Sequence, residues 1–243
     1  MIPTDHPRYR SLVIRERMAA FAREGIVSWE GLTAHGRGEA FDYLIAERTT
    51  DSARIAERTA AAMLLGARHP VISINGNTAA LAAPEIAALQ RACGALVEVN
   101  LFHRTEERVR QIEALLRDAG VTVFSGTAEQ LLPLSHDRAW CRREGMYAAD
   151  LVLVPLEDGD RCEALVRMGK QVIAIDLNPL SRTARTATLT VVDELTRALP
   201  VITDACTTLT SREQAQLLDS LDNHYLLKKA MDEITARLSH ALD

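Results

Sequence analysis

Apolar residues at helical spacing run through the first 66 positions of the chain. An approximate helical stripe is formed by Tyr9, Leu12, Val13, Met18 and Phe21. This stripe predicts a helix that ends before Gly25. Segments 39–47 and 51–65 predict two more helices, and the glycine-interrupted stretch 34–39 between the first and the second is expected to be a loop. The pattern therefore indicates a helical N-terminal portion over 1–66.

Beyond residue 70, short apolar runs alternate with amphipathic segments. The predicted strands are 71–75, 96–101, 121–124, 151–156, 171–176 and 188–192. The predicted helices are those around 84–93, 105–118 and 160–168, with an irregular stretch up to about 149. Strands that are apolar on both faces and alternate with helices are typical of a mainly parallel, doubly wound sheet. Right-handed crossovers would place helices on both of its faces. We therefore predict an α/β fold.

The last part of the chain carries a helical stripe of its own. Residues 211–241 predict one long amphipathic helix, which would pack on its own chain or on a partner subunit. No internal repeat and no low-complexity linker occurs. We predict a single domain over 1–243, with the α/β core at 70–200.

Composition narrows the function classes. The 243 residues carry a formal net charge of −5, and 47% of them are hydrophobic. This balance is typical of a folded protein and gives no basic nucleic-acid footprint. No stretch approaches the roughly 20 apolar residues of a membrane span, and the first residues lack a signal-peptide core. Four widely spaced cysteines are expected to be reduced thiols. We expect a cytoplasmic protein without nucleic-acid or membrane partners.

Lysine is scarce. Only Lys170, Lys228 and Lys229 occur, and no GK[ST] phosphate-binding loop exists. Arginine binds phosphate and carboxylate groups in a bidentate manner and is always charged. If the protein binds anionic ligands, arginine side chains must supply most of the contacts.

Polar sequences follow four of the predicted strands. They lie at 75–77, 100–104, 157–161 and 176–183. Ligands of open α/β sheets bind beyond the carboxyl ends of the strands. Polar sequences at the ends of four strands in one sheet indicate a ligand-binding cleft.

The 176–183 sequence has the most specific pattern. Asp176 ends a strand as the ribose-binding acid of a dinucleotide-binding protein does, and Ser181-Arg182-Thr183 can begin a helix whose N–H groups form an anion site. The competing interpretation is a strand-end turn with a solvated arginine. The glycine fingerprint of a dinucleotide site is missing after Asn75-Gly76.

Two further stretches each have two interpretations, a contact with a ligand or an ordinary helix cap. In the first, 35–39, Arg37 would reach a phosphate at a helix entry, or Glu39 would only cap that helix. In the second, 157–160, the carboxylates suit Mg²⁺, or Asp160 caps the next helix. Arg15 and Arg17 are two residues apart on a helix, so at most one of them points into a site.

Taken in order, several long motifs resemble one known family. They are AHGRGEAFDYLI (34–45), SINGNTAAL (73–81), EVNLFHRTEERV (98–109), VPLEDGDRCEALVRMGK (154–170) and IDLNPLSRTAR (175–185). Together with the opening IPTDHPRYR and Arg15-Glu16, they resemble the archaeal phosphopantothenate synthetase family over roughly residues 2–200. The last forty or so residues carry no matching motif.

The resemblance implies a Rossmann-like homodimer and an ATP- and Mg²⁺-dependent ligase. Members of the family join 4-phosphopantoate to β-alanine through an acyl-adenylate, which gives 4-phosphopantothenate, AMP and pyrophosphate. Carried over residue by residue, the nucleotide contacts would be Arg15, Arg37, Asp176, Leu177, Asn178, Arg182, Thr183 and the turn at Glu194. At that turn this chain has Asp193-Glu194-Leu195 where relatives often have Asp-Asn-Ile, a change that a backbone contact would survive.

The second substrate has its own candidates at the strand ends. For the pantoate and β-alanine side we predict Asn75, Asn77, His103, Arg104 and Glu157. Arg104, Glu157 and His35 are the candidates for catalysis, and the metal ligands stay open. The alternatives are a nicotinamide-dependent oxidoreductase and a non-catalytic nucleotide-binding regulator. AMP release that depends on both organic substrates would separate all three.

Overall fold

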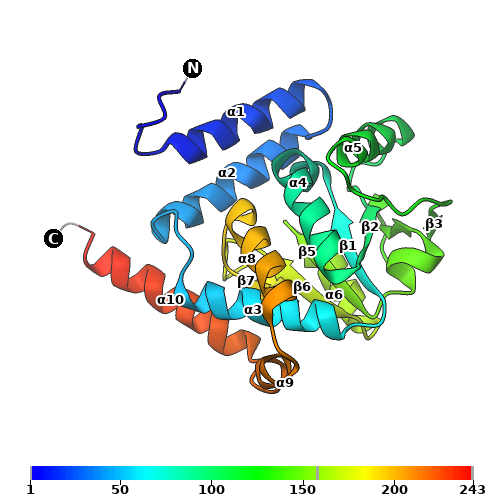
Figure 1. The fold of residues 1–243 in the computed structure, drawn as a ribbon. Coiled ribbons are helices and arrows are strands. Elements are labelled where there is room, and N and C mark those ends of the chain that lie inside the picture. The colour runs from blue at the N-terminus through cyan, green and yellow to red at the C-terminus, as the bar shows by residue number, and fades with distance from the viewer. Residues whose placement is uncertain (1, 157–158, 242–243) are drawn as a thin grey trace.

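The computed structural model describes residues 2–156 and 159–241 (Figure 1). Its α-helices are α1 (Tyr9–Arg23), α2 (Trp29–Leu44), α3 (Asp51–Gly66), α4 (Gly76–Cys93), α5 (Glu106–Asp118), α6 (Gly159–Arg167), α7 (Arg182–Thr186), α8 (Leu195–Thr208), α9 (Ser211–Asp219) and α10 (Asn223–Ser239). Its strands are β1 (Pro70–Ile74), β2 (Leu96–Val99), β3 (Glu129–Gln130), β4 (Trp140–Cys141), β5 (Leu151–Pro155), β6 (Gln171–Ile175) and β7 (Leu189–Val191). Two short helical turns are η1 (Asp137–Ala139) and η2 (Arg143–Tyr147).

The main sheet is parallel throughout, with the strand order β2-β1-β5-β6-β7. Beyond β2, Val123 forms a single parallel bridge with Val97. If that bridge is counted as a strand and the six parallel strands are renumbered along the chain, the order in the sheet becomes 3-2-1-4-5-6. This is the doubly wound Rossmann order. The predicted parallel α/β sheet is confirmed. The predicted strand at 121–124 is wrong beyond this one bridge, because the chain turns away at Gly126, whose φ is +138°.

Helices cover both faces of the sheet. Ile72, Ile74 and Ile173 belong to the core cluster that includes residues of α3, α4, α5 and α8. Val152 and Val172 point to the opposite face, toward α6. Figure 1 shows α3, α4 and α8 in front of the sheet, with α1 and α2 packed above α4. Successive side chains of a strand point to opposite faces of the sheet. Both faces are apolar because helices bury both of them.

The predicted loop at 34–39 is instead the middle of α2. Glycine costs about 1 kcal/mol in a helix interior, so Gly36 and Gly38 weaken the helix locally. Packing offsets this cost. The Ser28 side chain caps the helix by accepting from the Gly31 N–H, and Glu39 accepts two bonds from Arg15 on α1.

The C-terminal region also departs from the prediction of one helix over 211–241. It forms α9 and α10, separated at 220–222. The Asp222 side chain caps α10 by accepting from Tyr225 N, and Asn223 donates to the carbonyls of Ala184 and Ala187. These bonds fix the start of α10 against the end of α7. Helix α8, which the sequence pattern did not reveal, contains Pro200 and packs on α3 and α4.

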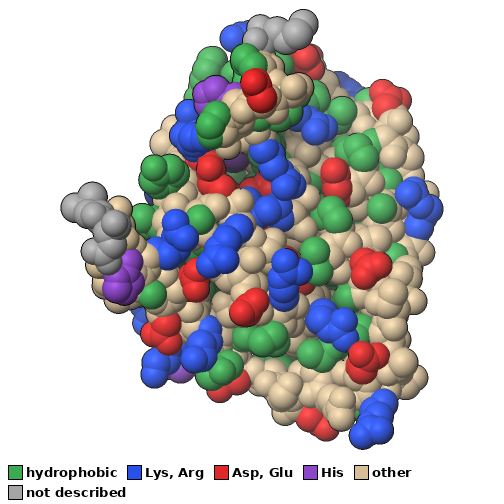
Figure 2. Space-filling view, turned by 60° about the vertical axis from the view of Figure 1, so that its left-hand side comes forward, with side chains coloured by type: hydrophobic (Ala, Val, Ile, Leu, Met, Phe, Trp, Pro, Cys, Tyr) green, Lys and Arg blue, Asp and Glu red, His purple; other side chains and the backbone are tan. Residues whose placement is uncertain are grey.

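No described helix is long and apolar enough to cross a membrane. Cys93, Cys141, Cys162 and Cys206 are free thiols, and three of the four are buried. Figure 2 shows basic and acidic side chains interspersed over the face that it presents, with apolar side chains between them.

Candidate active site

A cavity of about 720 Å³ opens at the carboxyl edge of the sheet. Its walls come from α2, from the residues that follow β1, β2, β5 and β6, and from the starts of α4 and α7. The order of the strands reverses between β1 and β5, and doubly wound sheets bind ligands at such a switch point. The fold therefore places the cavity where a Rossmann-like protein holds its substrate.

Most of the predicted site residues meet in this cavity. Those that line it are His35, Arg37, Asn75, Asn77, His103, Asp176, Leu177, Asn178, Arg182 and Thr183. They come from four separate stretches of sequence, three at strand ends and one in α2, and the fold brings these stretches together. Glu157 lies outside the described residues.

Three predicted residues lie outside the lining of the cavity. The Arg15 Nε donates to both carboxylate oxygens of Glu39, at 2.7 and 2.9 Å. The Arg104 guanidinium bonds to Glu106 at 2.8 Å. The Glu194 carboxylate caps α8 by accepting from Thr196 N at 2.9 Å. Each of these side chains has a protein partner that a ligand would have to replace.

The segment after β6 is a self-bonded turn. Asp176 accepts from the Ser181 hydroxyl at 2.5 Å and from Asn178 N at 2.9 Å. Burial raises the pKa of Asp176, and these bonds together with the charge of Arg37 offset part of the rise. The Ser181 hydroxyl also caps α7 by accepting from Ala184 N. Asp176 thus shapes the turn and presents the backbone of 177–178 to the cavity.

Two arginines border the cavity near this turn. Arg182, at the first position of α7, pairs with Asp160. Arg37 is exposed on α2 and forms no hydrogen bond or ion pair with the residues that the structure describes. Arg37 lines the same cavity as Asp176, and its charge offsets part of the rise in the Asp176 pKa. The cavity therefore has a cationic rim with at least one uncommitted guanidinium.

The asparagines at the end of β1 are bonded to backbone. Asn75 caps α4 by accepting from Thr78 N, and its amide donates to Leu156 O at 2.9 Å, which ties β1 to β5. The Asn77 amide donates to Gly31 O at 2.8 Å and holds α2 over α4. A Cβ on Gly76 would lie 2.1 Å from Ile26 O, so only glycine fits there. This packing leaves the first turn of α4, a helix that is kinked at Ala82, facing the cavity.

Sequence reasoning missed two cationic side chains of the lining, Arg108 and Arg138. Arg108 lies four residues after Arg104 inside the 98–109 motif, so the motif itself was a usable signal. Its Nε and Nη2 donate to Ile26 O, and burial lowers its pKa. Arg138 lies in η1, within a stretch whose pattern predicted no regular structure.

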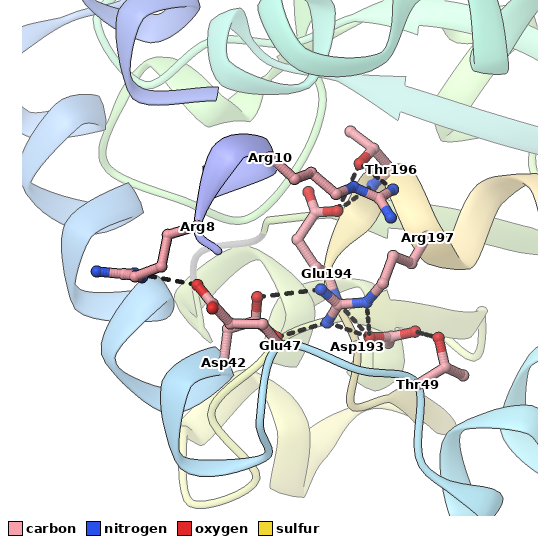
Figure 3. Close-up of polar contacts among 9 residues, drawn as sticks. All are labelled: Arg8, Arg10, Asp42, Glu47, Thr49, Asp193, Glu194, Thr196 and Arg197. Carbon is pink, nitrogen blue, oxygen red and sulfur yellow. Dashed lines mark hydrogen bonds and ion pairs between the residues drawn. The ribbon is translucent and has the colours of Figure 1, made fainter. Parts of the chain in front are cut away.

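A buried ion cluster joins the helical N-terminal portion to the sheet beside this cavity (Figure 3). Arg197 of α8 donates to Asp42 of α2 at 2.5 Å and to Asp193, just after β7, at 2.6 Å. Thr49 donates to the other oxygen of Asp193 at 2.6 Å. Burial opposes the charge on Arg197, but the two carboxylates outweigh this effect and raise its pKa. The cluster clamps α2, which carries Arg37 and His35, to the end of β7.

Glu57 on α3 faces the same cluster. It is fully buried, and its carboxyl group interacts with the Asp193 carboxylate. Burial, reinforced by the Asp193 carboxylate, raises the pKa of Glu57 to about 9. The side chain is therefore protonated in the folded protein at neutral pH and ionised in the unfolded chain.

We expect the variant Glu57→Gln to remove a pH dependence of stability. Folding of the parent takes up a proton between the ordinary pKa of 4.5 and about 9, so its stability falls as pH rises through that window. As the pH rises through this window, the free energy of unfolding of the variant relative to that of the parent should increase by up to about 1.4 kcal/mol per pH unit. Urea unfolding at several pH values measures this difference. Glu107→Gln, on an exposed site of α5, is the control, and parallel curves for Glu57→Gln and the parent would contradict the account.

Comparisons with known proteins identify the family. The phosphopantothenate/pantothenate synthetase family matches residues 52–237. A 4-phosphopantoate--beta-alanine ligase of Methanospirillum hungatei is 58% identical over 243 residues, with 100% of both chains covered. The ligases of that name from Methanosarcina mazei and Thermococcus kodakarensis are 52% and 47% identical, and cover 98% of this chain and 95% and 94% of their own. This chain belongs to the phosphopantothenate/pantothenate synthetase family.

Proposed function

We propose that the protein joins 4-phosphopantoate to β-alanine in coenzyme A biosynthesis and converts ATP to AMP and pyrophosphate. The observation that carries this proposal is the full-length similarity to ligases of that name. The cavity adds physical support, because it gathers four arginines at the switch point of the sheet. ATP and a phosphorylated acid repel each other, so a site for both needs cations between them.

The reaction proceeds in two displacements. The carboxylate of 4-phosphopantoate attacks the α-phosphorus of ATP, and pyrophosphate leaves with the electrons of the broken P–O bond. The amine of β-alanine then attacks the acyl carbon of the adenylate, loses a proton and expels AMP. Arg37 and Arg182 would bind the triphosphate, and the backbone of 177–178 would hold the nucleoside. A guanidinium aimed at the developing charge lowers the barrier, and an enclosed cavity protects the adenylate from water.

Mg²⁺ would accompany the nucleotide. The described residues hold no group of three or more His, Cys, Asp or Glu side chains placed for a metal. Mg²⁺ commonly binds through one or two carboxylates and substrate phosphates and keeps several waters, so the triphosphate itself would hold the ion in the cavity. When bound, the ion would neutralise phosphate charge.

The other predicted residues keep their proposed roles as predictions. Arg15 and the turn at Glu194 are proposed at the nucleotide, and Asn75, Asn77 and His103 at the second substrate. Arg104 and Glu157 are proposed for catalysis. The bonds from Arg15 to Glu39 and from Arg104 to Glu106 mean that both arginines would have to exchange partners when a ligand binds.

His35 is proposed as the base that accepts the proton of the β-alanine amine. It lines the cavity, and its Nε2 has no hydrogen-bond partner among the described residues. Burial lowers its pKa, so the imidazole is neutral and able to accept a proton near pH 7. We expect kcat to fall as pH drops through the His35 pKa, which lies below its ordinary value of 6.5.

Rates measured from acid to neutral pH test this role. His35→Gln should lower kcat and lose the acidic limb of the profile, while His69→Gln, outside the cavity, should retain both. An unchanged acidic limb in His35→Gln would remove His35 from the mechanism.

The whole function is tested by mixing the protein with ATP, Mg²⁺, β-alanine and either pantoate or 4-phosphopantoate. AMP release that requires both organic substrates supports the ligase. Pyrophosphate formation without β-alanine supports the adenylate route. ATP binding without turnover would favour a nucleotide-binding regulator, and reduction of a nicotinamide would favour an oxidoreductase.

A cytoplasmic homodimer is part of the proposal. Helix α10 exposes Tyr225 and Leu238, which are 51% and 58% exposed, so it offers apolar surface to a second subunit. Light scattering of the purified protein measures its oligomeric state.

A further inference from the structure

Carboxylates are rare in the lining of the cavity. Of the described residues that line it, only Glu30 and Asp176 are acidic. Asp176 is committed to its own turn, because it accepts from the Ser181 hydroxyl and from Asn178 N. Among the described residues, Glu30 is therefore the carboxylate of the lining that a positively charged ligand could reach.

Glu30 lies in the first turn of α2, and its side chain is 71% exposed. Its own backbone N–H and the Ser28 hydroxyl lower its pKa, so the carboxylate is ionised at neutral pH. Its one ion-pair partner among the described residues is His103, whose Nε2 lies 3.8 Å away and whose side chain is 55% exposed. Because so exposed a pair contributes little, a substrate cation can replace His103 at small cost.

The guanidinium of Arg108 lies near Glu30 but does not pair with it. The two charges act on each other, while Arg108 donates to the carbonyls of Ile26 and His103 and forms no ion pair with a described residue. This cation would repel Mg²⁺ from Glu30. An amino acid is not disfavoured in the same way, because it carries a carboxylate of its own.

Helix α2 spans two ends of the cavity. Arg37 lies at the end that contains Asp176, and Glu30 lies at the end that contains His103. Seven positions separate Glu30 from Arg37, which corresponds to about 10 Å along the helix axis. His35 lies between them on the helix and also lines the cavity. The carboxylate is thus removed from the proposed triphosphate site, where it would repel phosphate, and the proposed base lies between the two.

β-Alanine is the one substrate of the proposed reaction that carries a positive charge. Its amine is protonated at neutral pH, as a lysine side chain is, whereas ATP and 4-phosphopantoate carry only negative charge. We propose that Glu30 binds the ammonium group of β-alanine and makes this end of the cavity specific for an amine. The proposal rests on the ligase function proposed above. Glu30 would keep one N–H of the amine while His35 accepts the proton that the amine loses.

Steady-state kinetics of Glu30→Gln test this contact. The variant should raise the KM for β-alanine about 10-fold, because a charge-assisted hydrogen bond is lost, and should not raise the KM for ATP or for 4-phosphopantoate. Glu30→Asp keeps the charge on a shorter side chain, so its KM for β-alanine should lie between those of the parent and of Glu30→Gln. An unchanged KM for β-alanine in Glu30→Gln would overturn the assignment. A higher KM for ATP would also overturn it, since Glu30 would then act on the nucleotide or its metal.

Glu107→Gln is the matched control. Glu107 is an exposed carboxylate in the first turn of α5 and does not line the cavity. Its removal also takes a negative charge from the start of a helix, so all three KM values should equal those of the parent if the effect of Glu30 is a contact with substrate. Pyrophosphate formation without β-alanine isolates the first displacement. Its rate should be the same in Glu30→Gln as in the parent, and a slower rate would contradict a role confined to the amine.

The parent protein separates this proposal from the function on which it rests. Absence of AMP release by the parent with all three substrates would reject the ligase function. An active parent whose Glu30→Gln variant keeps the KM for β-alanine would reject only the ammonium contact.

Discussion

Arg37→Ala should reduce kcat/KM by about 10²- to 10³-fold, the loss typical of removing one donor aimed at transition-state charge. Arg37 is exposed and has no partner among the described residues, so its charge is available to the triphosphate. For the same reason its removal should leave stability within about 0.5 kcal/mol of the parent. Initial rates at varied ATP concentration, with thermal unfolding alongside, measure both quantities.

Arg17→Ala is the matched control, because Arg17 is an exposed arginine on the neighbouring helix α1 and does not line the cavity. Its rate should equal that of the parent. A normal rate for Arg37→Ala, or a loss that merely follows a loss of stability, would show that Arg37 has no part in the reaction.

Arg197→Met should destabilise the protein by about 3–5 kcal/mol, which is the usual effect of removing one partner from a buried ion pair. Asp42 and Asp193 have side chains that are 8% and 0% exposed, so both carboxylates would lose their cation without gaining water. Burial already raises the pKa of Asp42, and loss of the guanidinium raises it further. The destabilisation should therefore be largest at neutral pH and shrink as the pH falls and the carboxylates become protonated.

Urea unfolding of the parent and variant, at neutral and at acid pH, measures this effect. The double variant Asp42→Asn/Arg197→Met should recover part of the lost stability, because one unpaired charge is then absent. Arg212→Met, on an exposed site of α9, provides the control. A loss for Arg197→Met below about 1 kcal/mol at neutral pH would mean that the cluster behaves as a surface ion pair.

The sheet could be predicted because its strands are buried on both faces. Runs such as 151–156 and 171–176 leave few alternatives once helical segments separate them, and the polar residues that follow them must then meet at one edge. This local information was sufficient to place Asp176, Arg182 and Asn75 in one cavity.

What the sequence did not reveal depends on long-range contacts. Helix α2 runs through Gly36 and Gly38 because α4 and Arg15 hold it, and neither contact is visible in local propensity. Arg138 Nη1 donates to the carbonyl of Asn100, 38 residues earlier, and this contact is likewise not visible in the local sequence. Periodicity carries no signal for such a position.

A crystal structure with a non-hydrolysable ATP analogue and 4-phosphopantoate would test most directly whether the two substrates share this cavity. We expect the nucleoside against the backbone of 177–178, the triphosphate between Arg37 and Arg182, and the acid in the same cavity. A nucleotide bound elsewhere, with Arg37 and Arg182 turned to separate regions of solvent, would contradict the account.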